Sequence, residues 1–175
     1  DTAFNESFAT AVERAGVQHW LAQPGNEVWR GQWLAYEQRH ADFLHLLHQY
    51  RQQLQAVYDA DLPDALKRER KRAVFDALKA ASAFLIQKHG PRMAGYFSAP
   101  LGGAHLAAVA AYNDWVSAFE VLRVREQGDW ARFYAQVQRL AQRAPDERTA
   151  ALRALQAQAA SAPAAPAAAE GPAPL

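Results

Sequence analysis

Residues 27–58 read EVWRGQWLAYEQRHADFLHLLHQYRQQLQAVY. Large apolar residues return at intervals of three and four along this stretch, which is the spacing of one face of an α-helix. A helix of this length indicates the scaffold of a helical bundle, so the sequence predicts an all-α fold with a long central helix. The residues expected on its inner face are Trp33, Tyr36, Phe43, Leu44, Leu47, Tyr50, Leu54 and Val57.

Helical spacing of apolar residues also marks the segments on both sides of this helix. Gly25 follows a first short helix, Pro63 precedes a third helix, and Asp129 stands as the cap of a later one. We therefore expect a bundle of about five to six helices, with residues 93–103 as a packed loop. The expected helices cover residues 5–16 (or as far as the turn at 23–25), 27–58, 64–89, 105–126, a segment from 129 onward, and 146–159. In the third helix the apolar face is expected to carry Leu66, Ala73, Ala77, Phe84 and Leu85.

The composition fits one globular domain. The chain has 175 residues, of which 50% are hydrophobic and 11% aromatic, and this is enough to build one hydrophobic core. We expect that domain to span residues 1–160. Residues 161–175 are mostly alanine and proline, too poor in large apolar side chains to offset the entropy of ordering, so the sequence predicts a disordered tail.

Charge, cysteine content and motifs exclude several classes of function. The formal net charge is +1, so no global field favours nucleic acid or an anionic membrane. The absence of cysteine excludes disulfides and thiolate-bound metals. No apolar run is long enough for a transmembrane helix, and neither a phosphate-binding glycine loop nor a G-x-S-x-G motif is present. The basic run at residues 67–72 contains a glutamate and is interpreted as a solvated helix face, so no nucleic-acid partner is expected.

Three histidines, His40, His45 and His48, resemble a metal cluster only at first sight. On a helix His45 and His48 are neighbours, whereas His40 points well away from His45. We interpret them as surface or half-buried side chains.

The segment that suggests chemistry is residues 1–13, DTAFNESFATAVE. Glu6 lies in the first turn of a predicted helix between Phe4 and Phe8, and small residues follow one turn later. This arrangement suits a gluzincin, in which one helix supplies two histidines from H-E-x-x-H and a second helix supplies a glutamate as third zinc ligand. The alternative is a carboxylate that stabilises the helix start through the macrodipole or by capping a neighbouring amide.

Residues 4–10, F-N-E-S-F-A-T, resemble a segment of the bacterial predicted aminopeptidases, where it follows H-E-x-x-H. Weaker similarity continues at residues 50–58, 101–119 and 129–134, so the resemblance covers most of residues 1–142. The 175 residues contain no H-E-x-x-H. The resemblance therefore implies that this chain is the C-terminal part of a zinc aminopeptidase, starting just after that motif, with the missing segment as its structural partner.

The resemblance also implies roles for particular residues. Glu6 would be the third zinc ligand in the intact parent, which would cleave short peptides at a free amino terminus. Tyr112 and His105, and also Tyr96, are candidates for the side chain that stabilises the oxyanion in gluzincins. Tyr112 is preferred because it is expected on the apolar face of its helix, where its hydroxyl could point into a cleft; the alternative is a core tyrosine. The family further implies a location on the periplasmic side of a bacterial envelope, with a lipid anchor outside these residues.

The missing H-E-x-x-H segment has two expected consequences. The 175-residue chain alone should have no peptidase activity, because one ligand cannot hold a catalytic zinc ion. The helix that contains Glu6 should expose Phe4 or Phe8 and exchange its amide protons faster than the helix at residues 27–58. The alternative function is a non-enzymatic helical module that binds a protein through an aromatic groove, and binding of RNA or anionic lipid through residues 67–72 ranks last.

Overall fold

The computed structural model describes residues 1–97 and 101–161, and for residues 160 and 161 it describes the backbone alone. Every regular element in this part of the chain is a helix, so the predicted all-α fold is confirmed. The helices are α1 (Thr2–Leu21), α2 (Glu27–Asp59), α3 (Asp64–His89), α4 (Pro91–Phe97), α5 (Gly103–Asn113), α6 (Val116–Arg125), α7 (Trp130–Ala141) and α8 (Pro145–Ser161). None of them is long and apolar enough to cross a membrane. The tail predicted to be disordered begins at the last residue of α8 and otherwise lies outside the described residues.

The contacts between residues divide the chain into two compact units. The terminal unit consists of residues 1–13 together with the chain from Asp114 onward, and the central unit consists of Arg14–Asn113. Helix α1 contributes its first part to one unit and its last part to the other. Sequence reasoning expected one domain over residues 1–160 and did not anticipate this division.

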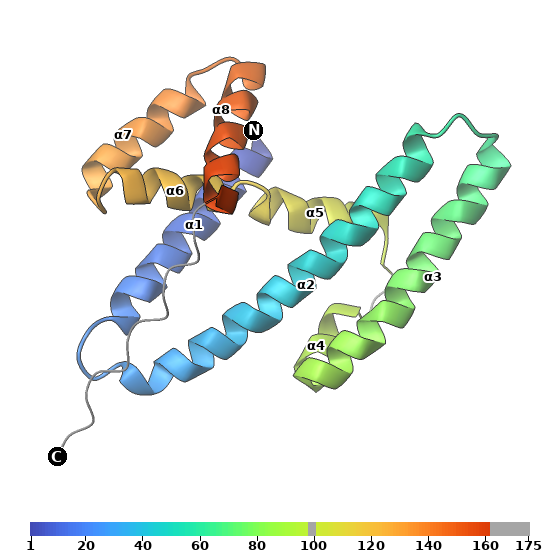
Figure 1. Cartoon of the computed structure of the whole chain (residues 1–175), viewed down its shortest axis with the longest axis horizontal. Helices are drawn as coiled ribbons and strands as arrows, with labels where there is room; N and C mark the ends of the chain where they lie inside the picture. Colours follow the sequence, from blue (N-terminus) through green and yellow to red (C-terminus); the bar gives the residue numbers. More distant parts are fainter. Residues whose placement is uncertain (98–100, 162–175) are drawn as a thin grey trace. The chain divides into compact units, whose positions relative to one another are not determined.

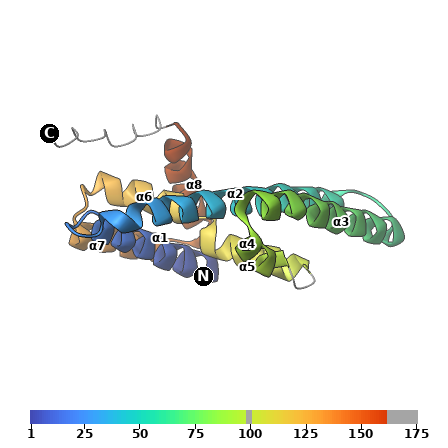
Figure 2. The same cartoon turned by 90° about the horizontal axis from the view of Figure 1, so that it is seen from below.

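The central unit is built around the antiparallel hairpin of α2 and α3, which run side by side in Figures 1 and 2. Pro63 follows the turn and cannot continue the preceding helix, while Asp64 opens the next one. The Tyr50 hydroxyl donates a hydrogen bond to the Ala77 carbonyl at 3.1 Å across the hairpin. The core of this unit contains Phe43, Leu46, Leu47, Leu54, Leu78, Leu85, Met93 and Leu106.

The buried faces of the hairpin differ in part from the predicted ones. In α2 the buried residues begin at Phe43, and Tyr36 is exposed. In α3 the face turned to the core carries Leu78, Ser82 and Leu85, whereas Phe84 is 68% exposed. The predicted inner positions of Tyr36, Ala73, Ala77 and Phe84 are therefore wrong, since all four residues are exposed. The polar residue Ser82 is tolerated on this buried face because its hydroxyl donates a hydrogen bond to the Lys79 carbonyl at 2.7 Å, within the same helix.

The segment predicted as a packed loop, residues 93–103, lies partly in helices. Gly90 ends α3 with a φ of 83°, a left-handed conformation that favours glycine. Pro91 then occupies the first position of α4, where its fixed φ and missing N–H favour a helix start. Residues 98–100 lie outside the described part, and α5 begins at Gly103.

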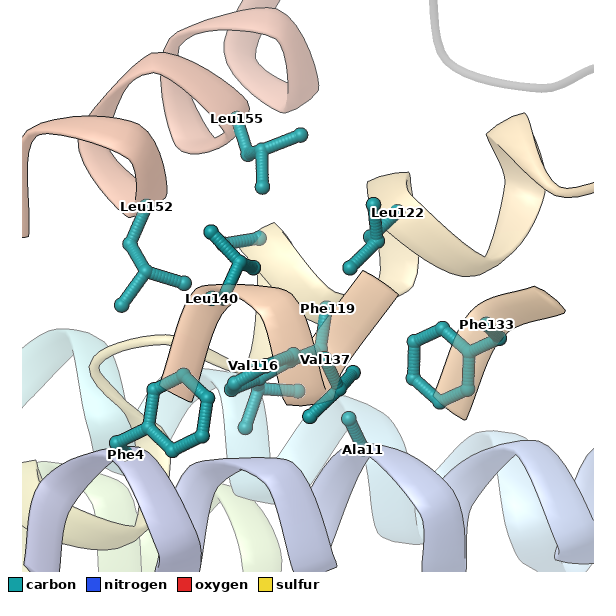
Figure 3. Packing of buried hydrophobic residues seen from close by; sticks show 11 residues of the cluster. Phe4, Ala11, Val116, Phe119, Leu122, Phe133, Val137, Leu140, Leu152 and Leu155 are labelled. Atoms are coloured by element: carbon teal, nitrogen blue, oxygen red, sulfur yellow. The ribbon is translucent and has the colours of Figure 1, made fainter. Parts of the chain in front are cut away.

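The core of the terminal unit joins the first turns of α1 to α6, α7 and α8. Figure 3 shows Phe4 and Ala11 on α1 pointing toward Val116, Phe119 and Val137. Phe4 is only 4% exposed, and its ring lies 5.2 Å from that of Phe119 in an edge-to-face arrangement. Phe8 packs on the same ring at 5.6 Å. The expectation that Phe4 or Phe8 would be exposed is wrong, because α6, α7 and α8 supply the packing partner that α1 needs.

The helix predicted at residues 105–126 is broken into α5 and α6 at Asp114 and Trp115. At the break, the Trp115 amide donates to Ser7 Oγ at 3.2 Å, and the Asp114 carbonyl accepts from Gln156. Backbone groups of the break thus bond to side chains of α1 and α8. Partners more than forty residues away in sequence set this break, so helical periodicity alone could not reveal it. The predicted cap of α7 is confirmed, since Asp129 Oδ1 accepts from the Arg132 amide at 3.0 Å.

Candidate functional site

The first turn of α1 is held at its amino end by Asp1. Its Oδ1 accepts a hydrogen bond from the Phe4 amide at 3.3 Å, the contact of a helix cap. Its Oδ2 lies 2.9 Å from Arg148 Nη2 of α8, and the Arg148 guanidinium also lies over the Phe4 ring, 5.4 Å from its centre. The amino end of the helix is therefore attached to α8 by charge and to the core by Phe4.

Ser7 fixes the next point along the same helix. It is fully buried and accepts the hydrogen bond from the Trp115 amide described above. Together with Phe4, Phe8 and Ala11 it forms the face of α1 that packs in the terminal unit. Three residues of the segment that resembles the aminopeptidases, Phe4, Ser7 and Phe8, thus have identifiable packing roles, and the rotation of the helix about its axis is determined.

Glu6 lies on another side of this fixed helix. It is half-buried, and within residues 1–97 and 101–161 its carboxylate has no hydrogen bond or ion pair. Thr10 and Glu13 follow on nearly the same face, the first half-buried and the second exposed. The capping role considered for Glu6 belongs to Asp1 instead. The structure therefore presents one carboxylate on a rigid turn with its acceptor capacity unused by the described residues.

The described residues alone do not fit a zinc ion. No group of three His, Cys, Asp or Glu side chains among them is placed to hold a metal. His45 and His48 each contact a glutamine four residues on, at 3.0 and 2.8 Å, and His40 contacts Asn113 at 3.3 Å. His45 and His48 are exposed and His40 is half-buried, which confirms their interpretation as surface or half-buried side chains.

His105 and Tyr112 lie on α5 in the central unit, whereas Glu6 belongs to the terminal unit. They are seven residues apart and so share one face of α5. His105 is exposed, and its Nδ1 accepts from the Gly102 amide at 3.3 Å, a contact at the helix start. Tyr112 is 49% exposed, and the buried residues of α5 are Leu106 and Ala110. The predicted place of Tyr112 on the apolar face is therefore wrong, while its catalytic role stays a prediction.

Sequence reasoning missed a pocket in the central unit. It is lined by Tyr36, Arg39, His40 and Phe43 of α2 and by Arg92, Met93 and Tyr96 of α4. The spacing of the four α2 residues, which places them on one helix face, was a usable signal. Their pairing with α4 was not, because α4 was expected to be a loop.

Sequence reasoning also missed an ionic cluster that ties α2 to the end of α3. Asp42 Oδ2 accepts from Lys88 Nζ at 2.6 Å and lies 2.7 Å from His89 Nε2, while Oδ1 accepts from Gln38 at 3.0 Å. The Lys88 hydrogen bond, followed by that of His89, lowers the pKa of Asp42 from 3.8 to about 2. This cluster is a structural link between two helices.

A family model described as "Putative aminopeptidase" matches residues 1–152, which is more than half of the chain. The chain belongs to this putative aminopeptidase family. The match spans both units, including the Glu6 turn and the helices that pack against it. Searches of curated proteins and of solved structures gave no match.

Proposed function

We propose that this chain supplies the third ligand, Glu6, of a zinc aminopeptidase whose two histidine ligands come from an H-E-x-x-H segment that residues 1–175 do not contain. The observation that carries the proposal is the Glu6 carboxylate itself, half-buried on a packed turn without a partner among the described residues. A buried or half-buried carboxylate normally has its charge compensated, so an unused one on a rigid element suits a metal ligand. Family membership over residues 1–152 supports the same reaction class.

In such a site zinc would bind and activate a water molecule for attack on a peptide carbonyl. The contribution of this chain is to position one carboxylate. Asp1, Phe4 and Ser7 fix the helix along its first two turns, and Glu6 projects from the turn between them. Rigid support of this kind matters because a ligand displaced by a fraction of an ångström loses metal affinity.

Further parts of the proposal rest on the family. The substrates are short peptides with a free amino end, and the protein works on the periplasmic side of a bacterial envelope. His105 and Tyr112 are proposed as donors to the oxyanion, and their exposure on one face of α5 keeps both side chains available for that role.

Hydrolysis of an aminoacyl-naphthylamide tests the proposal. We expect none from the 175-residue chain alone, and hydrolysis from a polypeptide that joins it to the H-E-x-x-H segment of the family. In that polypeptide Glu6→Ala should lower kcat/KM by about 10³-fold or more, since a catalytic metal contributes several kcal/mol to the transition state. Glu13→Ala is the matched control, because Glu13 is exposed on nearly the same face. Equal activity of the two variants would remove Glu6 from the site.

A second candidate function, a protein-binding helical module, is favoured by one observation. Trp20 and Trp29 of the central unit are each 47% exposed, so two large aromatic side chains are available to a protein partner. This function requires no metal. It predicts that Glu6→Ala changes the stability of the longer polypeptide but not its rate of aminoacyl-naphthylamide hydrolysis.

A further inference from the structure

The pocket between α2 and α4 has a volume of about 200 Å³. Phe43 and Met93 are buried and form its apolar floor. Tyr36 and Tyr96 also line the pocket and are 43% and 58% exposed, and Arg39 and Arg92 add two charged groups to its lining. The pocket therefore has an apolar base and a polar opening.

Ring contacts hold the sides of the pocket in place. The Tyr96 ring lies 4.8 Å from that of Phe43, and the Tyr36 ring stacks on His40 at 5.7 Å with an angle of 9° between the planes. His40 is also held by Asn113, whose Oδ1 lies 3.3 Å from His40 Nε2. Because Asn113 Nδ2 donates to the Val109 carbonyl at 2.8 Å, its Oδ1 is the atom left to accept from His40. The pocket is thus shaped before any ligand enters.

The rim carries positive charge that the described residues do not neutralise. Arg39 and Arg92 line the pocket, and neither guanidinium has a hydrogen bond or an ion pair within residues 1–97 and 101–161. None of the described residues that line the pocket is acidic. The acids that flank it on α2 are engaged elsewhere, Glu37 with Arg14 and Asp42 with Lys88 and His89.

These features select a ligand class. Two unpaired guanidinium groups favour an anion with paired oxygens, such as a carboxylate. The aromatic sides and apolar floor favour a flat apolar group beside that anion. The volume is below the roughly 300–1,000 Å³ of pockets for drug-sized ligands, which excludes a nucleotide and leaves room for a group the size of one amino-acid residue.

We propose that this pocket binds a carboxylate attached to one aromatic or large aliphatic group, with the carboxylate between Arg39 and Arg92 and the apolar group against Phe43 and Met93. A free aromatic acid and the carboxyl-terminal residue of a peptide share this chemistry. The proposal does not depend on the peptidase function, because every residue that carries it lies in the central unit and none is a candidate metal ligand.

Calorimetric titration of the 175-residue chain tests the proposal with two pairs of ligands. Each pair consists of an acid and its neutral amide: 3-phenylpropionate with 3-phenylpropionamide, and acetyl-Ala-Phe with acetyl-Ala-Phe-amide. Each acid should bind about tenfold more tightly than its amide, because only the acid accepts charge-assisted hydrogen bonds. If acetyl-Ala-Phe binds more tightly than 3-phenylpropionate, the ligand is the carboxyl-terminal residue of a peptide. If the two acids bind equally, a free aromatic acid is a sufficient ligand. Phenyl phosphate is the competing anion. If phenyl phosphate binds and neither carboxylic acid binds, the assignment to carboxylates is overturned.

Variants locate the binding. Arg39→Gln and Arg92→Gln should each reduce the affinity for the acids about tenfold and leave that for the amides unchanged. Arg143→Gln, which removes one exposed charge outside the pocket, is the matched control. Arg92 is exposed, so its replacement preserves the fold, and circular dichroism verifies this. Equal affinity for acid and amide, or equal loss in the control, would overturn the proposal.

Discussion

Ser7 and Glu6 are neighbours in sequence with opposite environments. Ser7 is fully buried and hydrogen-bonded to the backbone between α5 and α6, whereas Glu6 is half-buried without a partner among the described residues. The pattern F-N-E-S-F-A-T pointed to Glu6 because it resembles a segment of the bacterial predicted aminopeptidases. It could not assign Ser7, because the partner of that hydroxyl is 108 residues away.

Ser7→Ala tests the structural half of this motif. The change leaves the Trp115 amide without its acceptor, so we expect a loss of about 1–2 kcal/mol in the free energy of unfolding. Urea denaturation followed by circular dichroism measures it. Asn5→Ala, at an exposed position of the same helix, should change stability by less than about 0.5 kcal/mol. A loss of equal size in both variants would contradict the role of the hydrogen bond.

Asp42 should make the stability of the chain depend on pH in the acidic range. Its pKa in the folded chain, about 2, is below its ordinary value of 3.8, so the folded state favours the carboxylate. The resulting stabilisation is fully present above about pH 4 and is lost as the pH falls from 3.8 toward 2. Because the Lys88 side chain, which makes the strongest contact, is 48% exposed and solvent screens its charge, we expect about 1 kcal/mol.

Asp42→Asn should flatten the stability curve in this interval, as measured by urea titrations at several pH values between 2 and 5. Asp61→Asn is the control, since Asp61 is exposed and has no partner within the described residues. The same loss of pH dependence in Asp61→Asn would refute the account. The cluster could not be predicted from sequence, because its members are 46 and 47 residues apart.

At the scale of elements, the existence of the long helices could be predicted, whereas their ends and faces could be predicted only in part. Periodicity located α2, α3 and α7 because each carries a regular apolar stripe and a recognisable cap or breaker. The break at Asp114 and Trp115 has no glycine or proline and depends on side chains of α1 and α8. The inner face of α3 was misplaced because Ala77 and Phe84 share a spacing of seven, which is as helical as that of Leu78 and Leu85.

Amide exchange should rank the helices differently from the order expected from sequence. The turns at residues 5–13 pack through Ser7 and Ala11, while residues 28–36 of α2 contain no buried side chain. We therefore expect slower exchange at residues 5–13 than at residues 28–36, and the slowest exchange in α2 beyond Phe43. Hydrogen–deuterium exchange read out by NMR measures each amide. Faster exchange at residues 5–13 than at residues 28–36 would contradict the packing of α1 described above.

At the scale of the whole molecule, the fold class and the family could be inferred from sequence, and the division into two units could not. A contact-based division depends on which helices meet, and the terminal unit joins segments separated by 100 residues of chain. The difference between local and long-range features also explains why the candidate ligand was found and the pocket of the central unit was missed. Glu6 belongs to a local motif, whereas the pocket requires α2 and α4 together.

Zinc content tests the central claim most directly. In a polypeptide that joins the H-E-x-x-H segment to residues 1–175, we expect about one zinc ion per chain for the unchanged protein and for Glu13→Ala, measured by mass spectrometry of the metal after dialysis against a weak chelator. In Glu6→Ala the zinc affinity should fall by more than about tenfold, because one of three protein ligands is gone. Full zinc occupancy of Glu6→Ala under the same dialysis would show that this carboxylate does not bind the metal.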